Sequence, residues 1–132
     1  RQFNEHAGHD AGDHALRIVA QAIQGAIRSQ DIAARYGGEE FTIILPQTRS
    51  DHAAAVAERI RAAIANSWVP VQASDERIAI TASLGVATFP LDASTPATLL
   101  KGADLALYAA KHQGRNQVRI YTVIQHDEVL MS

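Results

Sequence analysis

The chain has 132 residues and a formal net charge of −2, from 12 Lys and Arg against 14 Asp and Glu. This length fits one compact domain with a single core, and the charge balance argues against a non-specific nucleic-acid binder, which usually carries a concentrated basic surface. The absence of cysteine excludes disulfides and thiolate metal sites, and no apolar run is long enough to predict a membrane span, so we expect neither nucleic acid nor membrane contact for this domain.

The first half of the chain alternates between helical and extended patterns. Its first thirteen residues are polar and contain Gly8 and Gly12, which predicts a loop. Apolar residues then recur at helical spacing over 14–29, with Asp13 as a candidate N-cap. Two short strands follow at 32–36 and 41–45, joined by a Gly-Gly-Glu-Glu hairpin.

The second half repeats this alternation. Helical periodicity returns over 51–66, and a β-rich stretch covers 78–88. The next helix is expected from about Pro96 to 113, because Pro96 suits a first helical turn and Gly114 lies just past the end. A closing strand is predicted over 117–123.

This order of elements has no strand before the first helix, and the sequence starts inside a polar loop without Met. We infer that a leading strand is missing from the sequence. Adding one gives an α+β, ferredoxin-like βαββαβ arrangement with a central antiparallel sheet and helices on one face. We expect one domain over residues 1–123 and a tail over 124–132.

The hairpin sequence is the first candidate site. Glu39 and Glu40 would stand at its tip, while Gly37 and Gly38 would let a phosphate or nucleotide approach the backbone. Carboxylates held in this way suit Mg²⁺, which prefers oxygen ligands and shares them with substrate phosphates. An ordinary solvated acidic turn accounts for the same composition, so turn chemistry alone leaves both interpretations open.

Other candidates also have simple structural explanations. Lys111 and Arg115 lie near the end of a predicted helix, where the dipole favours cations in any case. Three histidines near the start suggest zinc, but no second ligand group lies at standard spacing, which disfavours such a site. These histidines are His6, His9 and His14.

Four blocks, in order, are similar to the GGDEF family of diguanylate cyclases. R-Y-G-G-E-E-F at 35–41 resembles the family's signature loop in its GGEEF form. N-E-H-A-G-H-D-A-G-D at 4–13 resembles N-D-x-x-G-H-x-x-G-D, with Glu5 in place of Asp. S-L-G-V-A at 83–87 and the A-D-x-A-L-Y-x-A-K-x-x-G-R-N pattern at 103–116 complete the match. The resemblance implies a nucleotidyl-cyclase-like palm that condenses two GTP into cyclic di-GMP.

The resemblance also implies roles around the substrate. Glu39 would bind Mg²⁺ or Mn²⁺, and Glu40 would lie beside the metals and the attacking hydroxyl. Asn4 and Asp13 would hydrogen-bond guanine, whose N1–H and N2–H₂ donors suit an Asp acceptor. Lys111 would neutralise the triphosphate with its compact ammonium charge, and Arg115 would do so with a bidentate guanidinium. Gly37 and Gly38 would lie close to the nucleotide.

A second motif, Arg28-Ser29-Gln30-Asp31, fits the family's R-x-x-D inhibitory site, with five residues between Asp31 and Gly37. Arginine can grip guanine O6 and N7 while an aspartate accepts from the other edge. Arg59 falls where the family places a further product-binding arginine. An ordinary Arg and Asp at a helix end is the alternative to product inhibition.

The resemblance further implies a homodimer for catalysis, an upstream sensor domain, and a cytoplasmic domain in a protein that could be membrane-anchored elsewhere. The family's D-x-D-x-F-K block, with a further metal-binding Asp, should end at Arg1. We therefore expect the intact protein to be active and this sequence alone to bind metal poorly. The alternatives are a silent cyclic di-GMP or GTP sensor, an adenylyl cyclase or polymerase-like palm, and an interaction scaffold.

Overall fold

The structure, a computed structural model, describes residues 2–36, 39–70 and 76–122, and only the backbone of residues 2–11. Its helices and strands follow one another as α1 (Gln2–Ala26), β1 (Ile32–Arg35), β2 (Phe41–Ile44), α2 (Ser50–Ala65), β3 (Trp68–Pro70), β4 (Arg77–Ala79), β5 (Leu84–Val86), α3 (Pro96–His112) and β6 (Val118–Ile120).

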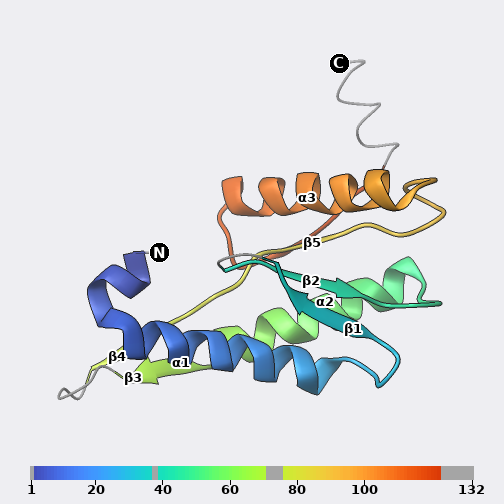
Figure 1. The fold of residues 1–132 in the computed structure, drawn as a ribbon. Coiled ribbons are helices and arrows are strands. Elements are labelled where there is room, and N and C mark those ends of the chain that lie inside the picture. The colour runs from blue at the N-terminus through green and yellow to red at the C-terminus, as the bar shows by residue number, and fades with distance from the viewer. Residues whose placement is uncertain (1, 37–38, 71–75, 123–132) are drawn as a thin grey trace.

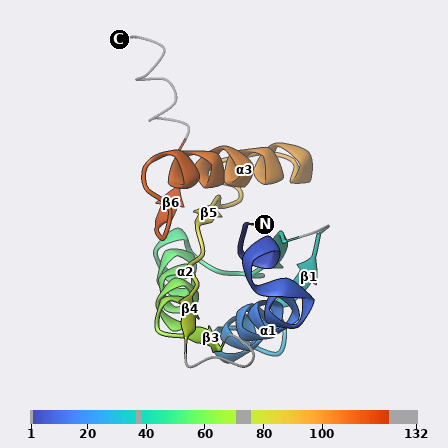
Figure 2. The same cartoon turned by 90° about the vertical axis from the view of Figure 1, so that its left-hand side faces the viewer.

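Helices cover the strands from two sides (Figure 1, Figure 2). The core on one side is formed by Ile23 of α1 and by Val56, Ile60 and Ile64 of α2, which are all buried. Apolar side chains of the strands pack against this cluster, namely those of Ala33, Phe41, Ile43 and Leu84. The third helix, α3, lies on the other side of β5 and β6.

Close packing at Gly85 explains the position of α3. A Cβ added to Gly85 would lie 2.2 Å from the Ala103 carbonyl oxygen and 2.4 Å from the Leu107 nitrogen, both in the α3 backbone. Because side chains alternate across a strand, Leu84 faces the α1–α2 core while Gly85 faces α3. The expectation that all helices lie on one face is therefore wrong.

The strands pair in three ladders. β1 and β2 form the predicted antiparallel hairpin, in which Ile32 lies opposite Ile44 and Arg35 opposite Phe41. β3 pairs with β4 in antiparallel fashion, and β5 with β6 in parallel. Among the described residues these are two-stranded sheets rather than one continuous sheet. The α+β palm class is confirmed by the solved neighbours reported below.

The prediction of a loop at the start of the chain is wrong, because α1 begins at Gln2 and runs through Gly8 and Gly12. A glycine inside a helix costs only about 1 kcal/mol relative to Ala, and Ala, Glu and Gln residues favour the helix around both positions. Asp13 lies inside this helix and is exposed, so it is not an N-cap.

The β-rich stretch predicted over 78–88 is divided in the structure. Its first part falls in β4 and its second part forms β5, with non-strand residues between them. The sequence did not predict β3, which pairs with β4 through Val69 opposite Ile78. A three-residue strand that ends in Pro70 gives little periodic signal, and proline is tolerated at a sheet edge.

Both ends of α3 match the prediction. Thr95 is the N-cap, and its side chain and that of Thr98 form a capping box, followed by Pro96 in the first turn. Gly114 follows the helix with a φ of +118°, a left-handed conformation that favours glycine. The Arg115 N–H donates to the Ala110 carbonyl at 2.9 Å, which closes the helix end.

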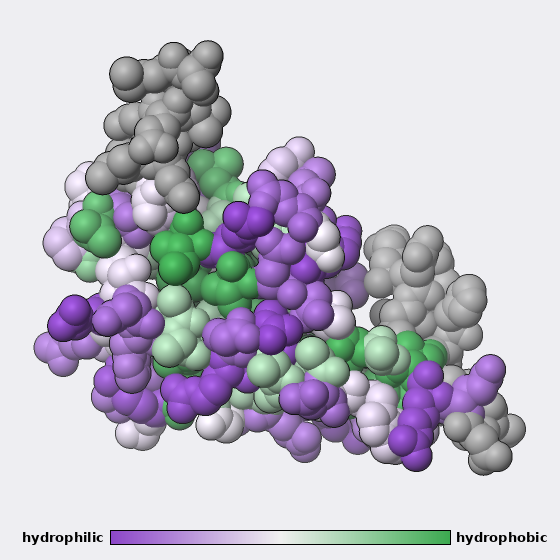
Figure 3. All heavy atoms as spheres, turned by 180° about the vertical axis from the view of Figure 1, so that it is seen from behind, coloured by the Kyte–Doolittle hydropathy of each residue, from purple (hydrophilic) through white to green (hydrophobic). Residues whose placement is uncertain are grey.

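No helix in the described part of the chain is both long and apolar enough to cross a bilayer. The face that carries α2 and β6 is shown in Figure 3. Apolar side chains gather in the middle of this face, between α3 above and α2 below, and Ile120 of β6 is 40% exposed.

Candidate functional site

The β1–β2 hairpin presents two carboxylates to solvent. The Tyr36 N–H donates to the Glu40 carbonyl at 2.6 Å, one step beyond the Arg35–Phe41 pair, and this bond closes the turn. Glu39 and Glu40 are both exposed. Gly37 and Gly38 lie outside the described residues, so their predicted contact with a nucleotide remains a prediction.

The end of α3 presents two cations. Lys111 lies in the last helical turn and is exposed. Arg115 follows in a turn where Gly114, Arg115 and Asn116 all have positive φ values, of 118°, 60° and 47°. Arg115 is also exposed. The family pattern placed both cations here, and the structure adds the unusual backbone that carries Arg115.

The start of α1 carries the two residues predicted to recognise guanine. Asp13 is exposed, while only the backbone of Asn4 is described. Nine residues separate them along one helix, a rise of about 13.5 Å. The helical form of α1 therefore does not bring these two residues together on one base.

The segments that carry the predicted substrate residues are spread across one side of the molecule. In Figure 1 the first turns of α1 lie at the left, and the C-terminal end of α3 lies nearer the middle, above the β1–β2 hairpin; in Figure 2 the end of α3 lies at the left and β1 at the right, with the first turns of α1 between them. The predicted acids and cations thus come from separate elements. This arrangement suits a polyphosphate, which needs cations for its charge and carboxylates to share a metal with it.

The acids fit a divalent cation of the Mg²⁺ type as partial ligands. Within the described ranges no group of three or more His, Asp or Glu side chains forms a closed metal site. Mg²⁺ is usually bound through one or two carboxylates together with substrate phosphates and water. Glu39 and Glu40 match that requirement in number and in chemistry.

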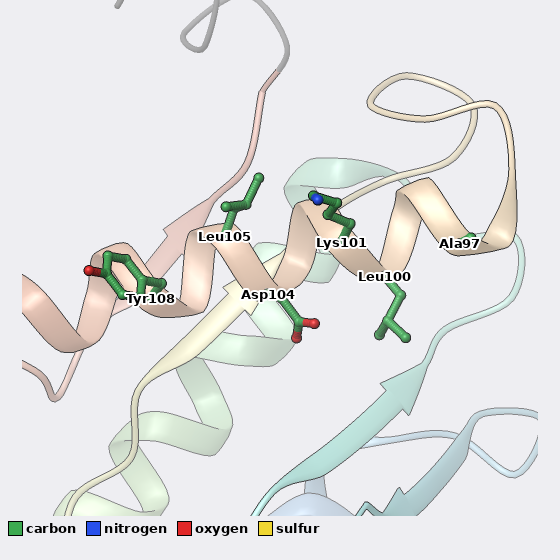
Figure 4. A pocket seen from close by; sticks show the side chains of 6 residues that line it. All are labelled: Ala97, Leu100, Lys101, Asp104, Leu105 and Tyr108. Atoms are coloured by element: carbon green, nitrogen blue, oxygen red, sulfur yellow. The ribbon is translucent and has the colours of Figure 1, made fainter.

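A shallow hollow of about 510 Å³ runs along α3 (Figure 4). In the close view Asp104 and Leu100 point down from the helix, whereas Leu105 points up. Its lining comes from α3 alone: Ala97, Leu100, Lys101, Asp104, Leu105 and Tyr108. None of the predicted site residues is among them, so the hollow is not the candidate site.

The R-x-x-D pair forms a compact cluster between α1 and β1. Arg28 donates from its backbone N–H to Asp31 Oδ2 at 2.7 Å, and its Nη2 donates to Asp31 Oδ1 at 3.0 Å. The same Nη2 atom reaches the Pro46 carbonyl at 3.0 Å and the Thr48 hydroxyl at 2.8 Å. Arg28 therefore links the start of β1 to the segment that follows β2.

Exposure differs strongly within this pair. The Arg28 side chain is 43% exposed, whereas that of Asp31 is only 2% exposed. The side-chain hydrogen bond from Arg28, followed by the bond from its backbone N–H, lowers the pKa of the Asp31 carboxyl against the opposing effect of burial. A ligand arriving from solvent thus meets Arg28 first.

Arg59 is exposed on α2. The contacts described for Arg28 go to Asp31, Pro46 and Thr48, and none goes to Arg59. The structure therefore joins two members of the predicted inhibitory set and leaves the third apart. The strand β1, four residues long, separates this cluster from the hairpin turn by about 13 Å, at 3.3 Å per residue.

Sequence reasoning missed several polar partners. Pro46 and Thr48 were not singled out, because they lie 18 and 20 residues from the arginine that they contact. Arg61 was also missed, although its i,i+3 spacing from Glu58 is a recognisable ion-pair signal. Its second contact, with Asn116, spans 55 residues and leaves no local pattern.

Comparisons with known proteins agree with one another. The sequence model of the family described as "Diguanylate cyclase, GGDEF domain" matches residues 1–117. The response regulator PleD of Caulobacter vibrioides is 41% identical over 118 residues, which cover 89% of this chain and 26% of PleD. The chain thus spans about a quarter of that relative.

Two solved structures show the same fold. The GGDEF domain of TpbB (YfiN) from Pseudomonas aeruginosa matches with a TM-score of 0.83 and 34% identity, over 92% of this chain and 75% of that one. The GGDEF domain of DgcB from Caulobacter crescentus, solved in complex with c-di-GMP, gives 0.81 and 36%, over 90% and 70%. With the family model matching most of its length, the chain belongs to the GGDEF domain family of diguanylate cyclases.

Proposed function

We propose that the protein containing this chain condenses two GTP molecules into cyclic di-GMP. Each domain holds one GTP, and two domains face each other as a homodimer. The 3′-hydroxyl oxygen of each GTP attacks the α-phosphate of the other, a P–O bond forms, and pyrophosphate leaves with the electrons of the broken bond. Positioning and electrostatics supply most of the rate.

Glu39 and Glu40 hold the divalent metal, Mg²⁺ or Mn²⁺. When bound, such a metal lowers the pKa of the attacking hydroxyl and stabilises charge on the phosphate. The exposed side chains of both acids, at the turn that the Tyr36–Glu40 backbone hydrogen bond closes, support this role. Glu40 lies next to the hydroxyl and assists its deprotonation.

Lys111 and Arg115 neutralise the triphosphate, and Asn4 and Asp13 recognise the guanine base. In the helical form of α1 the latter two stand about 13.5 Å apart along the axis. Binding one base with both residues therefore requires the first turns of α1 to unwind, and Gly8 and Gly12 are the weakest helix formers there.

One observation carries the proposal: a chain that matches the GGDEF family model over residues 1–117 has two exposed acids on the β1–β2 hairpin and two exposed cations at the end of α3. The test is pyrophosphate and cyclic di-GMP release from GTP and Mg²⁺ by the full-length protein. Glu40→Gln should reduce turnover about 100-fold, while Asp51→Asn, which removes an exposed acid from the start of α2, should leave it unchanged. Equal rates for Glu40→Gln and the parent would contradict the assignment.

We also propose product inhibition at Arg28 and Asp31, with Arg59 as a further contact. Cyclic di-GMP would first meet the exposed Arg28 guanidinium. Asp31 can accept from guanine only after Arg28 moves, because its carboxylate is covered. Arg28→Ala should relieve inhibition and spare turnover, with Arg49→Ala as the matched control. An unchanged inhibition curve for Arg28→Ala would argue against this site.

A silent binding module is the second candidate, because the Arg28–Asp31 cluster uses none of the acids assigned to the metal and Arg28 is open to solvent. In that case the full-length protein binds cyclic di-GMP and releases no pyrophosphate. The cyclase proposal also includes a cytoplasmic location for this domain, in a protein that could be membrane-anchored elsewhere, an upstream sensor domain and a domain limit at residue 123.

A further inference from the structure

We propose that Arg61 of α2 is a positioning residue for Arg115: by binding Asn116 it holds the turn after α3 in the shape that presents the Arg115 side chain to the substrate triphosphate. This inference rests on the proposed function and adds a residue that acts on the phosphate site from another helix.

The geometry of Arg61 suits this task. Its Nε donates to Glu58 Oε1 at 2.9 Å and its Nη2 to Glu58 Oε2 at 2.6 Å, which is a bidentate grip. Its Nη1 then donates to Asn116 Oδ1 at 2.8 Å. Glu58 therefore fixes the plane of the guanidinium, and the remaining edge points at the turn.

The anchor of this network is rigid. Arg61 directly follows Ile60, which is 2% exposed, and Ile64 one turn later is 1% exposed. The Arg61 side chain itself is only 21% exposed. Hydrogen bonds from Arg61 lower the pKa of Glu58, so the pair stays ionised at neutral pH. In Figure 3 a band of polar side chains runs from the C-terminal end of α3 toward α2.

The turn needs external support because of its backbone. Arg115 and Asn116 are consecutive non-glycine residues with φ values of 60° and 47°. Left-handed backbone is unfavourable for such residues, least so for Asn, and it persists where the surroundings fix it. Here the left-handed backbone includes Arg115, which we assign to binding of the substrate triphosphate.

Local hydrogen bonds supply part of this support. The Arg115 N–H closes the end of α3, and Gln117 Nε2 donates to the carbonyls of Gln113 at 3.0 Å and Arg115 at 3.1 Å. The Arg61–Asn116 bond differs because it comes from another helix. Together with the Leu84 N–H, which donates to the Gln117 carbonyl at 3.0 Å, it therefore fixes where the turn lies relative to the body of the domain.

The experiment removes the contact while the left-handed backbone stays accessible. In the full-length protein, Asn116→Gly keeps the left-handed conformation accessible but deletes the acceptor for Arg61. We expect its affinity for GTP to fall about tenfold, with GMP affinity unchanged, because GMP lacks the phosphates that Arg115 holds. Asn116→Asp keeps an acceptor for Arg61, so its affinity for GTP should be close to that of the parent. Arg49→Ala is the control for the loss of an exposed arginine.

A double-mutant cycle separates positioning from general damage. In an Arg115→Ala background, Asn116→Gly should change GTP affinity by less than about twofold, because its effect passes through Arg115. Equal losses for GTP and GMP, or additive losses in the cycle, would overturn the proposal while leaving the cyclase assignment intact. A parent protein that binds no GTP would overturn the proposed function and this inference with it.

Discussion

The packing of α3 on Gly85 gives a quantitative prediction for Gly85→Ala. The new methyl carbon would lie 2.2 Å and 2.4 Å from two backbone atoms of α3, where ordinary contact needs at least 3.4 Å. Backbone cannot rotate away as a side chain does, so α3 has to retreat from β5 by about 1 Å, which loosens contacts along its length. We expect a loss of about 3 kcal/mol in the free energy of unfolding, the upper end for overpacking.

A loss of that size lowers the melting temperature by roughly 10 °C for a domain of this length. The assay is thermal unfolding followed by circular dichroism, together with GTP affinity, since a displaced α3 also moves Lys111 and Arg115. Gly25→Ala is the matched control. A Cβ at Gly25 meets nothing within 4 Å, so this change should stabilise α1 by about 0.5–1 kcal/mol.

Gly102→Ala provides an intermediate case. Its Cβ would lie 2.7 Å from the Tyr121 ring, a side chain that can shift, so the cost should be about 1 kcal/mol. From most to least stable, the expected order is therefore Gly25→Ala, the parent, Gly102→Ala and Gly85→Ala. A melting temperature for Gly85→Ala equal to that of the parent would refute the close approach of α3.

Three other predictions each concern one side chain. Thr95→Ala removes the N-cap of α3 and should cost about 1 kcal/mol in denaturant unfolding; no shift in the midpoint would show that the capping box contributes nothing. Because Arg28 lowers the pKa of Asp31, the stability from this pair is complete above the ordinary Asp pKa of about 4 and is lost as the pH falls through the lowered value. Asp31→Asn should therefore flatten the acid limb of the stability curve, and an identical limb in both proteins would contradict this. Lys111→Ala should weaken GTP binding about tenfold yet leave cyclic di-GMP binding at Arg28 unchanged, which calorimetry can check; a joint loss would mean that the two sites are not separate.

Local patterns predicted the elements that carry strong periodic or capping signals. The helix over 51–66 became α2, and the proline and glycine that bound α3 marked its ends to within a residue. The β1–β2 hairpin followed from its glycine pair and flanking apolar residues. In each case the signal lies within a few residues of the element that it predicts.

The misses have physical causes. Composition at Gly8 and Gly12 suggested a loop, but two glycines are too small a penalty to stop a helix that other residues favour. The position of α3 depended on one missing side chain at Gly85, whose partners lie some twenty residues later. Which side of β5 a helix covers depends on contacts between residues far apart in the sequence. The alternation of side chains within β5 does not reveal it.

The candidate site was also predicted only in part from the sequence. The family blocks named Glu39, Lys111 and Arg115, and all three are exposed in the structure. The long-range contacts of Arg28 and Arg61 became visible only when the chain was folded.

Three consecutive left-handed residues after α3 limit which sequences this turn can accept. A β-branched residue at Arg115 or Asn116 would be rejected by the backbone itself, even if another position supplied the positive charge. Library selections at this turn should therefore return Asn, Asp and Gly at position 116 regardless of whether the screen asks for activity or for expression alone.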